Sequence, residues 1–172
     1  MFYHVSLSKT LDIHPRYFGP RLREVIEDIL KQKEEGICIG NFGYVVCITG
    51  LKEIGEGLIR PDGTGFATFT VKYDCVLFRP FRGEVLDATV QQVITGGFIA
   101  EAGPLEIFVS IHCIPDDYTF HSGDAAFVSA DESTRIQEGV DIRLRILSTR
   151  IDAAQIACVG TIKEDFLRVL ES

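Results

Sequence analysis

Residues 71–115 constrain the fold more than any other part of the chain, because strand-like runs follow one another there with glycine turns between them. The run EVLDATVQ alternates apolar and polar residues, as expected of a strand with one face in a core and the other in water. Gly96 and Gly97 predict the next turn, and FIAEA and LEIFVS predict two further strands. With GVDIRLRILSTRID and IACVGTI, these runs give the five short strands of an OB-type barrel.

The second and third of these strands carry a candidate surface for RNA. We expect the rings of Phe98 and Phe108 to lie side by side on neighbouring strands. Ser110 and His112 follow Phe108 at the spacing of one strand face. Two phenyl rings and an imidazole offer a surface on which bases can stack. The alternatives are that both phenylalanines belong to the barrel core and that His112 only satisfies a backbone group at a strand end.

Two arginines further along the barrel are candidates for contact with RNA phosphates. Arg143 and Arg145 alternate with aliphatic residues in GVDIRLRI, which places both on the solvent face of that strand. The alternative is that they are ordinary solvated charges.

The distribution of charge limits how tightly such a barrel can hold RNA. Residues 1–79 carry ten basic and ten acidic residues, whereas residues 80–172 carry seven basic and fifteen acidic ones. Within the second half, residues 115–139 form an acidic insertion with six acidic residues and only Arg135 against them. Because RNA binding depends on basic surface, we expect it to be weak, salt-sensitive and helped by a partner.

The first half of the chain predicts a helix on an antiparallel sheet. PRLREVIEDILKQKEEG has apolar residues at helical spacing, with Pro20 suited to the first helical position and Gly36 to the end. Strand-like runs with glycine turns follow it. The sequence therefore predicts an α+β chain with two domains, residues 1–79 and residues 80–172.

The residues give little support to an enzyme, a metal site or a membrane protein. The five cysteines form no C-x-x-C pair, and we expect no cofactor. His112, Asp116, Asp117 and His121 lie close together in the sequence, yet such residues in a polar loop are more often solvated than bound to a metal. No apolar run approaches the ~20 residues of a membrane span, so we expect no contact with membranes.

Five pieces of the sequence, in order and at consistent spacing, resemble one known family. They are HPRYFGPRL at 14–22, GNFGYVVCI at 40–48, VKYDCVLFRPFRGEV at 71–85, GGFIAEAGPLEIFVS at 96–110 and VGTIKEDFL at 159–167. Through them almost the whole chain resembles the larger stalk subunits of eukaryotic RNA polymerases, a family that also has archaeal members. The HPRYFGP block is most similar to the polymerase II members.

The resemblance implies a non-catalytic subunit with a ribonucleoprotein-like N-terminal tip domain and an RNA-binding OB domain. It implies a heterodimer with the smaller stalk subunit that docks on the RNA polymerase II core near the RNA exit channel and the clamp. It also implies contact with single-stranded nascent RNA, a role in transcription initiation, and a nuclear location. The alternative is a free-standing OB-fold protein that binds single-stranded RNA, such as a translation factor or an RNA chaperone.

The resemblance also implies roles for particular residues. OB relatives carry two aromatic residues three apart on the second strand; here Phe98 matches the second and Thr95 stands in place of the first. Ser110 stands where a histidine is usual, so the stacking surface is depleted. Contact with the polymerase core falls on one tip made from residues 40–44 and 55–65, namely Asn41, Phe42, Gly43, Gly55, Gly57 and Gly63.

Overall fold

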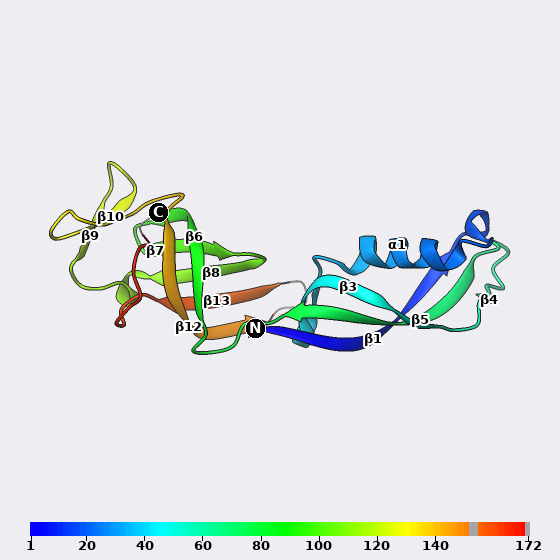
Figure 1. Cartoon of the computed structure of the whole chain (residues 1–172). Coiled ribbons are helices and arrows are strands. Elements are labelled where there is room, and N and C mark those ends of the chain that lie inside the picture. The colour runs from blue at the N-terminus through cyan, green and yellow to red at the C-terminus, as the bar shows by residue number, and fades with distance from the viewer. Residues whose placement is uncertain (152–154, 171–172) are drawn as a thin grey trace. The chain divides into compact units, whose positions relative to one another are not determined.

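A computed structural model describes residues 1–151 and 155–170 of the chain (Figure 1). Contacts between Cα atoms divide the chain into two compact units. One comprises Phe2–Arg79 and is called here the N-terminal unit; the other comprises Pro80–Ser172 with Met1 and is called the barrel unit. The predicted α+β class is confirmed, with one α-helix in the described residues and strands in both units.

The N-terminal unit is an antiparallel sheet covered on one face by the helix (Figure 1). The strands of the main path run in the order β1 (Phe2–Ile13), β5 (Ala67–Phe78), β3 (Gly43–Ile54) and β2 (Cys38–Ile39). A short strand, β4 (Leu58–Ile59), also pairs with β5. The short 3-10 helices η1 (Pro15–Tyr17) and η2 (Gly40–Phe42) follow β1 and precede β3.

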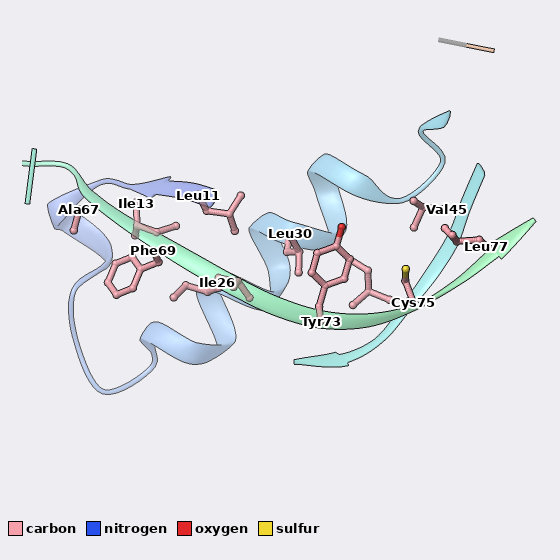
Figure 2. Close-up of a cluster of buried hydrophobic side chains, with 12 residues drawn as sticks. Leu11, Ile13, Ile26, Leu30, Val45, Ala67, Phe69, Tyr73, Cys75 and Leu77 are labelled. Carbon is pink, nitrogen blue, oxygen red and sulfur yellow. The ribbon is translucent and has the colours of Figure 1, made fainter. Parts of the chain in front are cut away.

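Helix α1 (Leu22–Glu34) has the apolar stripe that the sequence predicts. Ile26 and Leu30 are fully buried against β5, whose side chains alternate between the core and solvent (Figure 2). The helix begins two residues after Pro20, so the predicted first position is wrong, while Gly36 has φ +80 just past the last turn, as predicted. No helix among the described residues has the length and apolar character needed to cross a membrane.

One acidic side chain closes the core at the end of the helix. Glu34 is 5% exposed, accepts a hydrogen bond from the Tyr73 hydroxyl at 3.4 Å and pairs with the Lys9 ammonium at 3.0 Å. Burial, together with the nearby Glu34 carboxylate, raises the pKa of Tyr73 well above its usual value. The last turn of α1 is thereby tied to both β5 and β1.

The barrel unit contains the closed five-stranded barrel that the sequence predicts. Around the barrel the strands follow the order β12 (Asp141–Ile151), β13 (Ile156–Thr161), β8 (Leu105–Ser110), β7 (Gly97–Ala102) and β6 (Val85–Ile94). Among the described strands, only β13 and β8 pair in parallel, and β12 closes the barrel by pairing with β6. Aliphatic side chains and Phe98 fill its interior.

The acidic insertion forms a small sheet of its own instead of a plain polar loop. Its strands β9 (Tyr118–His121), β10 (Ala126–Ser129) and β11 (Arg135–Ile136) pair antiparallel. Phe127 and Ile136 are buried at 1% and 0% exposure, which gives this sheet an apolar interior. In the turn after β10, hydroxyl hydrogen bonds from Ser129 and Ser133 lower the pKa of Asp131 to about 2.

After β13 the chain makes a tight turn that places a phenylalanine in an unusual conformation. The Leu167 amide donates to the Glu164 carbonyl at 3.2 Å, and Phe166, the third residue of this turn, has φ +66. Its ring is 90% exposed, so packing does not offset the strain. The segment then returns to the barrel, where Val169 forms an isolated bridge with Ile142.

Replacing Phe166 with glycine should raise the free energy of unfolding of the barrel unit by about 1 kcal/mol, because glycine adopts positive φ without steric cost. Phe166→Ala is the matched control, since it removes the ring and keeps the backbone strain. Chemical denaturation of the three proteins measures the effect. A glycine variant no more stable than the alanine variant would show that this turn is not strained.

Candidate nucleic-acid interface

A row of side chains crosses the outer wall of the barrel and includes one aromatic ring. The backbone register pairs Gln92 with Ile99, Ile99 with Phe108, Phe108 with Val159 and Val159 with Ser148. Ile99 and Phe108 are half-buried and Val159 is 37% exposed. The centre of this row, here called the Phe108 row, is therefore an apolar strip that solvent can reach.

Phe98 does not belong to this surface, and the predicted pairing of the two phenyl rings is wrong. Phe98 is 0% exposed and pairs across the strands with Val109, which is also fully buried. Successive side chains of a strand point to opposite faces, so Phe98 lies in the barrel core while Phe108 lies outside. Ile99, which was not predicted, takes the place beside Phe108.

The sequence contains the signal that distinguishes these faces. Glu101 lies two residues after Ile99 and Glu106 two residues before Phe108, and both glutamates are exposed. A charged residue marks the solvent face of its strand, and residues two apart share a face. The positions of the glutamates therefore assign Ile99 and Phe108 to the solvent face.

Ser110 and His112 lie at the end of this surface, in a different arrangement from the one predicted. Ser110 ends β8 and is half-buried, while His112 lies in the 3-10 helix η3 (Ile111–Cys113) and is exposed. The His112 amide donates to the Ser110 hydroxyl at 3.4 Å, which caps η3. The strand alternation that placed His112 in line with Phe108 ends at Ser110, although both polar residues remain near the strand end.

Arg143 and Arg145 are both engaged by carboxylates. The Arg143 guanidinium donates to the two oxygens of Asp87 at 2.6 and 2.9 Å, and these bonds hold the pKa of Asp87 below its usual value. Arg145 pairs with Glu164 on the C-terminal segment. A phosphate contact at either arginine would therefore replace an existing ion pair.

The residues predicted to form one tip of the N-terminal unit lie at opposite ends of its sheet. Tyr44 pairs with Phe78 at one end of β5, whereas Ile59 pairs with Ala67 at the other. A strand of this length spans roughly 36 Å. The prediction of one common tip is therefore wrong, and the two groups form separate surfaces.

At the first end, Asn41 and Phe42 are exposed in η2, and Phe42 is 54% exposed. Gly43 is buried with φ +105, and a Cβ atom there would lie 2.5 Å from the Phe78 carbonyl oxygen. Gly43 is therefore required by backbone packing, and of the three predicted residues only Asn41 and Phe42 offer side chains to another molecule.

At the second end, three predicted glycines shape a loop that exposes two aliphatic side chains. A Cβ at Gly57 would lie 2.5 Å from the Phe69 ring, and Gly63 has φ +76. The Gly55 amide donates to the Thr70 carbonyl at 2.8 Å. Between the glycines lies β4, with Leu58 and Ile59 at 69% and 71% exposure.

Ion pairs hold this loop in place. Arg60 pairs with Asp12 of β1 at 2.9 Å and with Asp62 at 3.0 Å. Hydrogen bonds from Thr64 lower the pKa of Asp62.

The exposure of Leu58 and Ile59 was not predicted from the sequence. Because adjacent residues of a strand point to opposite faces, the sequence indicates only that one of the two lies outside the core, and it gives no signal that both are exposed.

The residues considered for metal binding do not lie together in one site. Asp116 pairs with Lys163 at 2.7 Å, and His121 lies on β9 within hydrogen-bonding distance of Thr119. In the part of the chain that the structure describes, no three His, Cys, Asp or Glu side chains are placed to hold a metal ion.

Comparison with known proteins covers both units. Residues 8–65 match the family model of the SHS2 domain found in the N terminus of Rpb7p/Rpc25p/MJ0397, and residues 79–158 match the S1 RNA binding domain. The chain is 53% identical to DNA-directed RNA polymerase II subunit RPB7 of Glycine max, over 99% of this chain and 97% of that protein. It is 37% identical to the subunit of the same name from Saccharomyces cerevisiae, over 97% and 98%, and 29% identical to subunit Rpo7 of Sulfolobus acidocaldarius, over 99% and 94%. The chain therefore belongs to the RPB7 family of RNA polymerase subunits.

Proposed function

We propose that this chain is the larger stalk subunit of RNA polymerase II, an accessory subunit without an active site of its own. In this role it pairs with the smaller stalk subunit, docks near the RNA exit channel and the clamp, contacts nascent RNA and supports transcription initiation in the nucleus. The observation that carries the proposal is the match to named RNA polymerase II subunits over 99% of the chain at 53% identity.

The open edge of the N-terminal sheet supports pairing with the smaller subunit. Strand β1 is twelve residues long and lies at the edge of the sheet, where no other described strand pairs with its outer side. A strand from another protein can pair there. Phe2 and Tyr3 on this strand are 65% and 43% exposed. A long open edge with exposed aromatic residues is a liability unless a partner covers it.

The loop around β4 supports docking on the polymerase core. Leu58 and Ile59 project from a loop that Arg60 holds by two ion pairs, and exposed aliphatic residues on such a fixed loop suit a protein pocket. Asn41 and Phe42 form a second candidate surface at the other end of the sheet.

The barrel unit supports contact with RNA through the Phe108 row. Phe108 offers one stacking ring, and Ser110 and His112 offer polar groups at the end of its strand. Stacking is worth about 1 to 3 kcal/mol per base, so a surface with one ring holds single-stranded RNA weakly. Such binding suits a transcript that the polymerase already keeps close.

Reconstitution from purified components tests the proposal. The chain should form a stable dimer with the smaller stalk subunit, and the dimer should bind polymerase that lacks both stalk subunits. Leu58→Asp with Ile59→Asp should weaken binding of the dimer to polymerase at least tenfold, because charges would enter an apolar interface.

The matched control for this experiment is Val85→Asp with Leu147→Asp, which puts two charges at aliphatic residues of the barrel unit that are 41% and 36% exposed and lie outside both candidate docking surfaces. It should leave polymerase binding unchanged. A chain that stays monomeric beside the smaller subunit and does not bind polymerase would favour the free-standing RNA-binding protein instead.

A further inference from the structure

Two glutamates face each other on the outer wall of the barrel, directly beside the Phe108 row. Glu101 on β7 pairs with Glu106 on β8, two residues along the strands from the pair formed by Ile99 and Phe108. Both glutamates are exposed, and within the described residues neither side chain has a hydrogen bond or an ion pair. Like charges directly opposite on neighbouring strands repel, so this arrangement costs stability.

The same glutamates line a hollow in the barrel surface. The hollow has a volume of about 420 Å³, and Gln91, Gln92 and Ile99 lie in its wall with the two carboxylates. No lysine or arginine among the described residues lines it. The apolar strip is therefore bordered on one side by an acidic, acceptor-rich hollow and on the other side by Ser110 and the exposed His112.

We propose that the Glu101–Glu106 pair determines where single-stranded RNA lies on the barrel and how tightly it is held. A transcript crosses Phe108 and continues past Ser110 and His112, while the end of the surface towards Glu101 and Glu106 excludes it. This inference rests on the RNA contact proposed above. The charge that limits RNA binding is then that of these two glutamates, and not that of the acidic insertion.

The physical reason is repulsion between the carboxylates and the RNA backbone. Each nucleotide carries a negative phosphate, and a carboxylate can only accept hydrogen bonds, so it offers the phosphate no compensating contact. The glutamates lie two residues from Ile99 and Phe108, about 7 Å along their strands. At this separation in water, one charge weakens binding of a phosphate by about threefold, and two together by about tenfold.

A basic segment of another protein is the competing occupant of this hollow. The match of residues 79–158 to the S1 RNA binding domain and the ring of Phe108 next to the hollow favour RNA. The experiment below separates the two.

Binding of a short fluorescent RNA, followed by anisotropy, tests the inference with the full chain. Glu101→Gln with Glu106→Gln should tighten binding about tenfold at low salt, and the gain should shrink at high salt because the charges are screened. The matched control is Glu132→Gln with Glu138→Gln, which removes the same charge from two exposed glutamates outside the row and should change affinity little. Thermal unfolding should show the first variant at least as stable as the wild type.

A photocrosslinking residue in place of Pro104, beside the hollow, reports the path directly. It should crosslink RNA only when both glutamates are neutralised. RNA binding by the wild type that the double variant does not improve would overturn this inference alone. An unchanged RNA affinity together with weaker binding to the smaller subunit or polymerase would assign the pair to a basic protein segment and overturn it as well. No RNA binding by either protein would overturn both the inference and the RNA contact on which it rests.

Discussion

Replacing Gly97 with alanine should lower the free energy of unfolding of the barrel unit by about 3 kcal/mol. Gly97 begins β7 with φ +146, and a Cβ atom there would lie 2.0 Å from the Val109 carbonyl oxygen and 3.0 Å from the Ser110 Cα atom. Both atoms belong to the backbone of β8, so they cannot move aside as a flexible side chain would. The expected loss combines overpacking with a backbone conformation that alanine disfavours.

Gly96 is the matched control, because it is the neighbouring residue of the same turn and a Cβ atom there meets nothing within 4 Å. Gly96→Ala should change stability by less than about 1 kcal/mol. The chain has two compact units, so the barrel has to be followed separately from the N-terminal unit. Hydrogen exchange of the amides in β7 and β8 measures the barrel directly, and equal protection in both variants would contradict the packing described for Gly97.

The alternation of apolar and polar residues was enough to predict the strands of the barrel. It was not enough to orient both β7 and β8, and the orientation predicted for β7 is wrong, because both faces of these strands contain large apolar residues. Phe98 and Ile99 are neighbours of similar hydrophobicity, and so are Phe108 and Val109. The glutamates on the same strands decide the orientation, whereas the aromatic residue alone pointed to the wrong face on β7.

In the N-terminal unit, the prediction from sequence failed over the pairing of strands that are far apart in the chain. Glycines near residues 40–44 and 55–65 look alike as turn residues, yet the pairing of Tyr44 with Phe78 and of Ile59 with Ala67 places them at opposite ends of β5. No local pattern states which residues of distant strands pair. The two surfaces could therefore be separated only with the structure.

The small sheet of the acidic insertion was not predicted from the sequence for a different reason. Its charges predict a solvated loop, but Phe127 and Ile136 are buried between its short strands. Eight mostly polar residues separate Phe127 from Ile136, and strands of two to four residues are too short to show alternation. Closing a small sheet of this kind depends on tertiary contacts that the sequence does not display.

Opposite effects are expected from alanine at the two phenylalanines that the sequence had placed together. Phe98→Ala should lower the free energy of unfolding of the barrel unit by about 4 kcal/mol, because the side chain is fully buried and its removal leaves a cavity. Phe108→Ala should cost about 1 kcal/mol or less, since its ring lies on the outer wall, yet it should weaken RNA binding by about tenfold through loss of a stacking platform.

The two variants are each other's control, because each removes one phenyl ring, Phe98→Ala from the inner face of the barrel wall and Phe108→Ala from its outer face. Denaturation followed by hydrogen exchange in β7 and β8 measures stability, and anisotropy of a short labelled RNA measures binding. At a temperature where both variants remain folded, Phe98→Ala should retain RNA affinity, since its side chain never reaches solvent. If Phe98→Ala instead reduced binding as much as Phe108→Ala while the barrel stayed folded, the Phe108 row would not be the RNA surface.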